Sequence, residues 1–285
     1  MTPRPRHIAA GALVAIGALL SSGCERALFS VANRGTLPPT DTVVYAMETG
    51  LALDVYRPEA TRASTGAAPV VVFFYGGSWE RGNRMQYRFV GSRLAENGVV
   101  AVVADYRTFP RAGFPDFMHD AAQAVAWARA NAARYGGDPE RVFIAGHSAG
   151  AQIAALLGTD GRYLAREGLR PDALAGVIGL SGPYDFAITG RYRAVFGPPG
   201  QWPDAQAINF VDGDEPPFLL VHGDGDRVVE ARDSVDLDAR LRAQGVASTL
   251  LLVPGAGHFA PAAAFYDPSR SPQVLPAVLA FIAEH

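Results

Sequence analysis

A stretch of five residues, Gly146-His147-Ser148-Ala149-Gly150, constrains the fold of this chain more than any other feature. It follows a mainly apolar run, 141–145, and precedes a segment of small and apolar residues, 151–157, an order that indicates a strand, a sharp turn and a helix. Glycines on both sides of the serine allow a turn in which a Cβ would clash with its neighbours. We therefore expect Ser148 at the start of a helix, beside free backbone N–H groups. An ordinary strand–helix junction is the alternative, so the motif needs partners.

Strand and helix patterns alternate along the rest of the chain. Two short runs, 43–47 and 51–56, flank a Glu-Thr-Gly turn and predict a hairpin. The other expected strands are 70–75, 99–104, 141–145, 174–180, 218–222 and 248–253, and the expected helices are 84–97, 115–135, 230–243 and 273–284. This alternation predicts a mostly parallel sheet with helices on both faces and the hairpin as an antiparallel edge. Ligands bind at the carboxyl ends of strands in such sheets, so the chemistry should lie just after strands.

The N-terminal residues have a different composition. A basic start precedes the apolar run 8–20, which is typical of a signal peptide and is short for a membrane span. Cys24 is the only cysteine among 285 residues. Its position is similar to that of the lipidated cysteine in bacterial lipoproteins, although those have leucine where Ser21 stands. We expect an exported protein that is lipid-anchored on the periplasmic side of the cell envelope; plain secretion and an uncleaved anchor are the alternatives.

This reading divides the chain into a signal peptide, 1–23, a tether, 24–40, and a single domain, 41–285. The tether contains Gly35, Pro38 and Pro39. A net charge of −3 gives no electrostatic footprint for nucleic acid. With one cysteine, the chain forms no internal disulfide, so its stability depends on the core. The sequence does not indicate an oligomeric state.

A serine hydroxyl needs a base, usually histidine, that is oriented by a carboxylate. His258 is the best candidate, because it follows the strand 248–253 in a loop with two glycines. The acid should follow the preceding strand, where Asp224 and Asp226 both occur. We favour Asp226, which lies further into the turn, and expect Asp224 to hold that turn through local backbone hydrogen bonds. His222 precedes both acids and is set aside.

An oxyanion needs backbone donors near the serine. Tyr75-Gly76-Gly77-Ser78-Trp79 follows the strand 70–75, and its small residues permit unusual backbone angles and close approach. A plain glycine turn is the alternative. We find no cluster of residues with metal-ligand spacing and no phosphate-binding loop, so we expect no cofactor and no metal.

Together these residues resemble the esterase and lipase branch of the α/β-hydrolases. The resemblance spans residues from about Val44 to the C-terminus and is closest to esterases related to isoprenylcysteine methylesterases, kynurenine formamidases and hormone-sensitive lipase. It rests on Tyr75-Gly76-Gly77-Ser78-Trp79 with Gly82, on Asp105 to Pro110, on Tyr135 to Pro139 and on the elbow at Ser148. The family implies Ser148, Asp226 and His258 as the catalytic triad and the N–H groups of Gly77, Ser78 and Ala149 as the oxyanion hole. Many relatives have histidine where this chain has Tyr75, and a third glycine where it has Ser78.

The resemblance implies a serine-dependent carboxylic ester hydrolase that acts on a small or medium ester. Amide hydrolysis, as by an arylformamidase, and a non-catalytic binding protein of the cell envelope are the alternatives. The segment 181–217 has no clear pattern and many aromatic residues. We expect it to form a small lid and a wall of the acyl pocket, with Trp79, Tyr184 and Phe186 as possible pocket residues. The stretch Asp105-Tyr106-Arg107 is interpreted as a structural corner rather than a substrate anchor.

Overall fold

An eight-stranded sheet forms the centre of the molecule in the computed structural model, which describes residues 27–59 and 66–285. The strands are β1 (Asp41–Ala46), β2 (Leu51–Tyr56), β3 (Ala68–Phe74), β4 (Val100–Ala104), β5 (Gly137–His147), β6 (Gly176–Leu180), β7 (Phe218–Gly223) and β8 (Ser248–Val253). Their order across the sheet is β1-β2-β4-β3-β5-β6-β7-β8. Strands β1 and β2 pair antiparallel with each other, β2 pairs antiparallel with β4, and all other pairs are parallel. The predicted hairpin and mostly parallel sheet are both confirmed.

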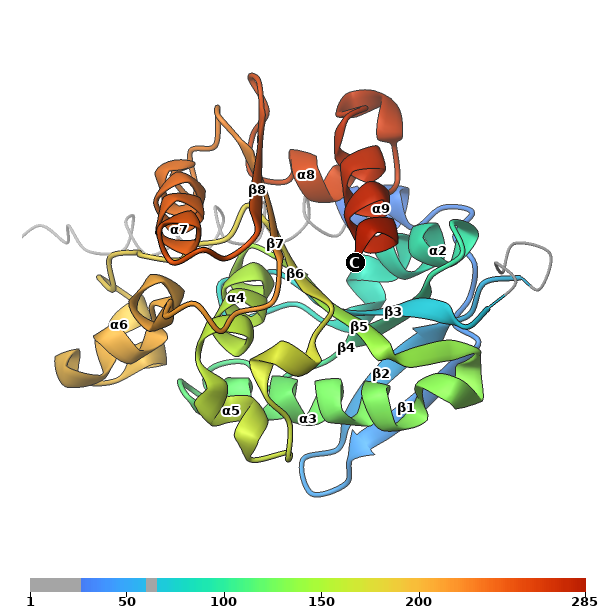
Figure 1. The fold of residues 1–285 in the computed structure, drawn as a ribbon, viewed down its shortest axis with the longest axis horizontal. Helices are drawn as coiled ribbons and strands as arrows, with labels where there is room; N and C mark the ends of the chain where they lie inside the picture. Colours follow the sequence, from blue (N-terminus) through green and yellow to red (C-terminus); the bar gives the residue numbers. More distant parts are fainter. Residues whose placement is uncertain (1–26, 60–65) are drawn as a thin grey trace, which may run out of the picture.

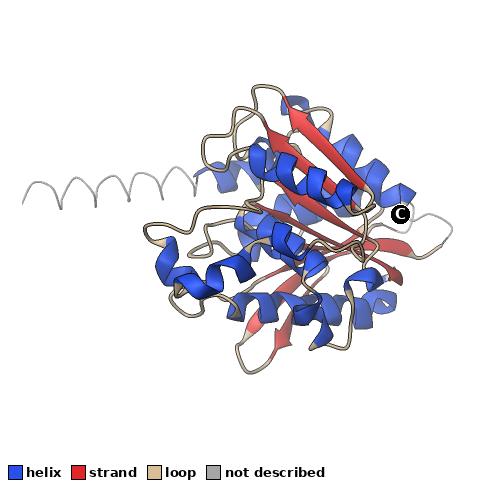
Figure 2. Cartoon of the chain, turned by 60° about the vertical axis from the view of Figure 1, so that its left-hand side comes forward, coloured by secondary structure: helices blue, strands red, loops and turns tan. Residues whose placement is uncertain are grey.

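Helices cover both faces of this sheet, and the sheet twists between them (Figures 1 and 2). The helices are α2 (Arg88–Glu96), α3 (Asp116–Asn131), α4 (Ala149–Thr159), α5 (Gly161–Ala165), α6 (Tyr192–Phe196), α7 (Arg232–Ala243), α8 (Ala260–Ala263) and α9 (Val274–Glu284). In Figure 1, α2, α8 and α9 lie on one face of the sheet and α3, α4, α5 and α7 on the other. Short 3-10 turns begin or extend several of them, for example Arg84–Tyr87 before α2 and Ala132–Tyr135 after α3.

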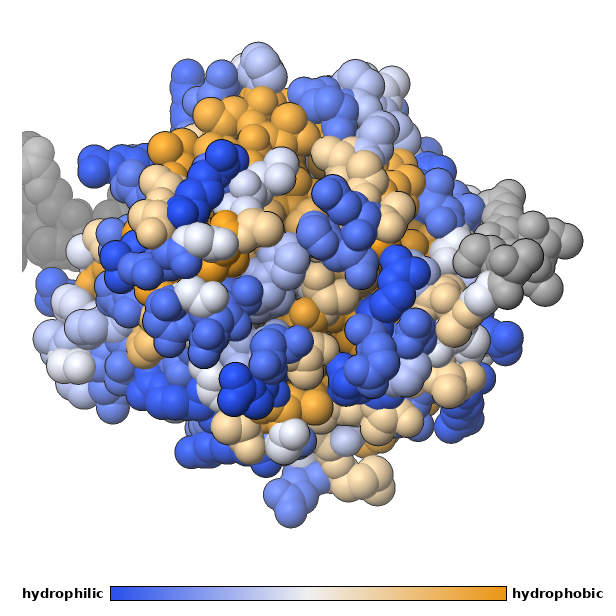
Figure 3. All heavy atoms as spheres, viewed as in Figure 1, coloured by the Kyte–Doolittle hydropathy of each residue, from blue (hydrophilic) through white to orange (hydrophobic). Residues whose placement is uncertain are grey.

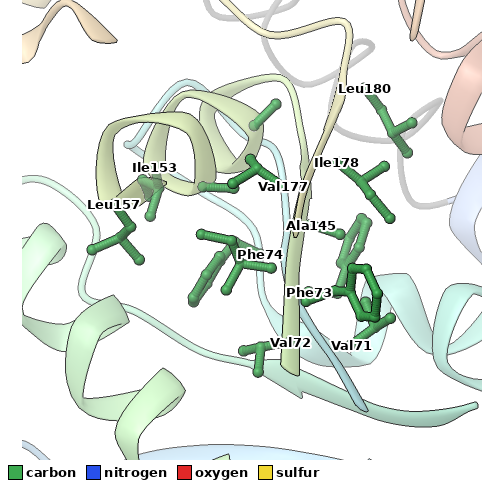
Figure 4. Packing of buried hydrophobic residues seen from close by; sticks show 14 of the residues in the cluster. Val71, Val72, Phe73, Phe74, Ala145, Ile153, Leu157, Val177, Ile178 and Leu180 are labelled. Atoms are coloured by element: carbon green, nitrogen blue, oxygen red, sulfur yellow. The ribbon is translucent and has the colours of Figure 1, made fainter. Parts of the chain in front are cut away.

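The core is built on the central strands. Every residue of 70–74 in β3 is buried, because helices cover both sides of this strand. Figure 4 shows Phe73 on one side of the sheet, near Ile178, and Phe74 on the other, near Ile153 of α4. This alternation explains why the sequence of β3 is continuously apolar rather than alternating. Strand β8, by contrast, forms an edge: Leu252 is 40% exposed, and an apolar patch lies over this edge at the top of Figure 3.

The N-terminal segment differs from its prediction as a tether. The signal segment 1–23 and Cys24 lie outside the described residues, but the part from 27 onward packs against the domain. Phe29 is only 7% exposed, and the Asn33 amide donates to the main-chain oxygens of Met85 and Gln86. Ser92 Oγ accepts a hydrogen bond from Leu37 N. Apolar burial and these hydrogen bonds hold the segment against the start of α2.

Among the described residues, none of the helices has both the length and the apolar character needed to span a bilayer.

Candidate active site

The turn at Ser148 joins β5 to α4. Ser148 has φ 55° and ψ −121°, a conformation that L-residues rarely adopt. The flanking glycines make the turn possible: a Cβ on Gly146 would lie 2.1 Å from the Gly150 oxygen, and a Cβ on Gly150 would lie 2.1 Å from the Phe74 oxygen. No side chain fits in either place. The strained turn places the serine hydroxyl at the carboxyl end of β5, and α4 begins at the next residue.

Ser148, His258 and Asp226 form one hydrogen-bonded chain. His258 Nε2 lies 2.9 Å from Ser148 Oγ, and His258 Nδ1 lies 2.7 Å from Asp226 Oδ2. His258 comes from the loop after β8, and Asp226 from the loop after β7. The side chain of Asp226 is fully buried, and that of His258 is 17% exposed. The structure therefore brings together, at the carboxyl ends of the parallel strands, the three residues that the sequence predicts.

Both oxygens of the Asp226 carboxylate are fixed. Oδ1 accepts hydrogen bonds from the main-chain N–H groups of Val228 and Val229, while Oδ2 faces the rings of His258 and His222. Burial raises the pKa of this carboxyl group, but the hydrogen bonds from His222, His258 and Val228 N outweigh it and hold the pKa well below its ordinary value. Asp226 is thus ionised at neutral pH, as a group that orients an imidazole must be.

His222 belongs to the site, although the sequence reasoning set it aside. It is fully buried, and its Nε2 lies 3.2 Å from both Asp226 Oδ2 and Val229 O. Both of these atoms accept, so Nε2 carries the proton and Nδ1 accepts from Ser234 Oγ at 2.7 Å. The signal in the sequence was the spacing: His222 is the last residue but one of β7 and lies four residues before Asp226, which is in the turn after that strand.

Asp224 has a different partner from the one predicted. Its Oδ1 accepts a hydrogen bond from Gly255 N in the loop after β8, rather than from the backbone of its own turn. Main-chain bonds between the same loops join Asp224 N to Val253 O and Gly225 N to Ala256 O. Asp224 therefore helps to hold the loop that carries His258 beside the loop that carries Asp226.

The loop after β3 lies beside the serine, as the sequence predicts for an oxyanion hole. A Cβ on Gly76 would be 3.1 Å from Ser148 Cβ, and a Cβ on Gly77 would be 2.0 Å from Arg81 O. Gly77 has φ 143° and Ser78 has φ 57°. Within the described part of the chain, the backbone N–H groups of Gly77, Ser78 and Ala149 are paired with no protein acceptor. They remain available for a negatively charged oxygen next to Ser148.

A cavity of about 540 Å³ opens at Ser148 and is lined in part by Ser78, Trp79 and Phe186. Trp79 is 3% exposed, and its ring stacks on Phe186 with the centroids 5.2 Å apart. Its indole N–H donates to Gln152 Oε1 at 3.0 Å. Trp79 therefore lines the cavity, as the sequence suggests, and is also packed into the protein by these contacts.

The expectation that Tyr184 lines the pocket is wrong. Tyr184 is fully buried and is absent from the cavity wall. Its ring fills space that two glycines leave: a Cβ on Gly179 would be 2.0 Å, and one on Gly182 2.5 Å, from its hydroxyl oxygen. Tyr184 is a core residue, and Phe186, two residues further on, forms the wall.

The segment 181–217 forms a fixed cap that contains α6 (Figure 1). Gln206 holds Phe186 by accepting from its N–H and donating to its carbonyl. The Gln152 amide donates to Ala205 O, and Asp233 of α7 accepts from the N–H groups of Tyr184 and Asp185. These hydrogen bonds to side chains explain how a segment with little regular structure keeps a defined wall.

The corner Asp105-Tyr106-Arg107 lies beneath the oxyanion-hole loop. Arg107 forms a two-pronged ion pair with Asp120, and Asp105 pairs with Arg84. Tyr106 Oη donates to Tyr75 O at 2.8 Å. These contacts fit the structural interpretation, since the charged groups are paired with each other within the protein.

Among residues 27–59 and 66–285, no group of three His, Cys, Asp or Glu side chains could hold a metal ion.

The sheet order, the elbow at Ser148 and the loops after β7 and β8 define an α/β-hydrolase. The BD-FAE family model matches residues 53–241, and the chain belongs to that family. Two solved structures share the fold. The apo form of Thermogutta terrifontis esterase 2 has a TM-score of 0.75 and 24% identity, covering 88% of this chain and 97% of that one. A truncated carbohydrate esterase from gut microbiota has a TM-score of 0.70 and 25% identity, covering 86% and 96%.

Curated relatives carry esterase names. Esterase LipC of Mycobacterium tuberculosis is 34% identical over 237 residues, which cover 76% of this chain and 58% of that protein. A probable isoprenylcysteine α-carbonyl methylesterase, ICMEL1, of Oryza sativa subsp. japonica is 31% identical over 254 residues, which cover 76% and 56%. The chain thus spans little more than half the length of these relatives.

Proposed function

We propose that this protein hydrolyses carboxylic esters through an acyl-enzyme formed on Ser148. The hydrogen-bonded chain from Ser148 through His258 to Asp226 carries the proposal, together with three adjacent backbone N–H groups that have no acceptor in the described part of the chain. The esterase names of the relatives support it. One solved structure shows Thermogutta terrifontis esterase 2 phosphonylated by sarin, with 25% identity to this chain.

Each group of the site has a role in the proposed reaction. Ser148 Oγ attacks the ester carbonyl carbon while His258 Nε2 takes the hydroxyl proton. The carbonyl oxygen becomes an oxyanion and accepts from the N–H groups of Gly77, Ser78 and Ala149. Asp226 keeps the proton on His258 Nδ1 and stabilises the imidazolium. The C–O bond then breaks, and His258 protonates the departing alcohol.

Deacylation uses the same groups in reverse. A water molecule gives a proton to His258 Nε2 and attacks the acyl carbon, and the second oxyanion occupies the same N–H groups. Its collapse breaks the bond to Ser148 Oγ, which recovers the proton from His258, and the carboxylic acid leaves. We propose a small or medium ester as the substrate, because the cavity at Ser148 is about 540 Å³ and is walled by Trp79 and Phe186.

A matched pair of substrates tests ester against amide hydrolysis. Phenyl formate and formanilide carry the same acyl and aryl groups and differ only in the scissile bond. We expect kcat/KM for phenyl formate to exceed that for formanilide by at least about 100-fold, since phenolate leaves the tetrahedral intermediate readily, whereas the anilide nitrogen must first be protonated by His258. Steady-state kinetics on both compounds measures the ratio. Equal kcat/KM values for the two compounds, or a higher value for formanilide, would contradict the ester proposal and favour amide hydrolysis.

We further propose that the protein is exported and lipid-anchored through Cys24. The basic start, the apolar run 8–20 and the single cysteine support this. In a bacterial host, the full chain should fractionate with membranes, and Cys24→Ala should appear in the soluble periplasmic fraction, because the acceptor thiol is gone. Esterase activity in both fractions reports the distribution. A Cys24→Ala protein that still fractionates with lipid would contradict lipidation.

A further inference from the structure

His147, the residue before the serine, lies where the parts of the site meet. Its side chain is buried, with 4% of the residue exposed. A Cβ on Gly76 would come within 2.9 Å of its Nδ1, so the ring packs against the oxyanion-hole loop. Its Nε2 lies 3.1 Å from the main-chain oxygen of His258. One side chain thus contacts the loop with the oxyanion donors and the backbone of the base.

Two neighbours of the His147 ring, the main-chain oxygen of His258 and the Tyr87 hydroxyl, determine which ring nitrogen carries the proton. Burial, with a smaller contribution from nearby His258, lowers the pKa of His147 to about 3, so the ring is neutral and carries a single N–H. The main-chain oxygen of His258 can only accept, which places that proton on Nε2. Nδ1 then accepts from Tyr87 Oη at 2.9 Å. Tyr87 therefore favours the tautomer that donates to His258.

The N-terminal segment packs against Tyr87 and against the residue that follows His258. The ring of Phe29 lies 5.2 Å from that of Tyr87 and 5.7 Å, edge-on, from that of Phe259, the residue after His258. Phe259 also contacts the His147 ring at 5.5 Å. Asn33 holds the segment in place, because its Oδ1 accepts from Phe89 N at 3.0 Å.

We propose that His147, Tyr87 and Phe29 form a support that fixes the backbone of His258, and that His147 is a positioning residue for the base. The hydrogen bond from His147 fixes the main chain at His258, and Phe29 packs against Phe259, the next residue in the chain. This rests on the proposed function, in which His258 is the base. It adds that the segment before the sheet, which the sequence suggests is a tether, is part of the active-site architecture.

Two replacements of His147 separate its hydrogen bond from its bulk. In His147→Gln, the amide can donate to the His258 oxygen and accept from Tyr87. In His147→Leu, the side chain fills similar space but makes neither bond. We expect His147→Leu to lower kcat for p-nitrophenyl butyrate about 10- to 100-fold, with KM within about threefold of wild type, because a misplaced base slows chemistry more than binding. His147→Gln should keep kcat within about threefold of wild type.

Smaller changes test the other two members of the support. Tyr87→Phe removes one hydroxyl and should lower kcat about 3- to 10-fold, whereas Tyr135→Phe, which loses a bond to the distant Asp41, should leave kcat unchanged. Phe29→Ala should lower kcat by a similar factor. Leu28→Ala is its matched control, because Leu28 lies beside Phe29 but is 37% exposed.

Thermal melting identifies any variant that does not fold, and titration with a fluorophosphonate counts the active sites. If His147→Leu fails to fold, Tyr87→Phe and Phe29→Ala carry the test. The support is contradicted if these variants keep wild-type kcat, or if His147→Gln is as slow as His147→Leu. Failure of the proposed function is distinguishable, because in that case wild-type protein itself neither hydrolyses the ester nor reacts with the phosphonate.

Discussion

Ser148→Ala is expected to lower kcat for p-nitrophenyl esters by at least about 10⁴-fold, because the variant has no atom that can form the acyl-enzyme. The fold should persist. Alanine can occupy the same strained turn as serine, and the glycines that make room for the turn are unchanged. Steady-state rates, together with circular dichroism and the melting temperature, separate loss of chemistry from loss of structure.

Ser181→Ala is the matched control for this variant. Ser181 also follows a parallel strand, has a positive φ of 53° and is fully buried. Its hydroxyl has no hydrogen-bond partner among the described residues. Removing that hydroxyl should leave kcat within about twofold of wild type. If Ser148→Ala keeps as much activity as Ser181→Ala, the nucleophile lies elsewhere.

Asp226→Asn is expected to lower kcat by about 10⁴-fold, because it moves the proton of neutral His258 from Nδ1 to Nε2. The main-chain N–H groups of Val228 and Val229 point at the position of Oδ1, so the amide oxygen must take that position. The amide NH₂ then faces His258 Nδ1 and donates to it. His258 is left with its proton on Nε2, where it cannot accept the proton of Ser148.

Asp224→Asn is the control for Asp226→Asn. Its amide oxygen can still accept from Gly255 N, so the loop after β8 should stay in place and kcat should fall by less than about tenfold. Rates for both variants, measured with the same ester, decide between the two carboxylates. An Asp226→Asn protein that keeps more than a tenth of wild-type kcat would contradict the role of Asp226.

Several site residues could be predicted from the sequence because the fold places chemistry after strands. Ser148, Asp226 and His258 each directly follow a strand or lie a few residues beyond one, and the carboxyl ends of parallel strands meet at one edge. The glycines around Ser148 were informative because a turn of that shape admits no side chain at those positions. The strands were recognisable because a central parallel strand, buried on both faces, is continuously apolar.

The other contacts could not be predicted, since they depend on the direction of side chains that are distant in the sequence. Tyr184 and Phe186 are both aromatic and two residues apart, yet one fills the core at Gly179 and the other walls the cavity. His222 contacts Asp226 only because the turn after β7 folds back on the strand. Phe29 belongs to a segment that resembles a linker in composition, and its partners Tyr87 and Phe259 show its role only in three dimensions.

Covalent labelling with a fluorophosphonate tests the central claim most directly, because the reagent needs an activated serine and adjacent oxyanion donors but no particular substrate. Intact mass and peptide mapping locate the adduct. We predict one adduct for each chain, on the peptide that contains Ser148, and none on Ser148→Ala. A folded wild-type protein that takes up no label, or that carries it on another residue, would contradict the assignment of Ser148 as the nucleophile of an ester hydrolase.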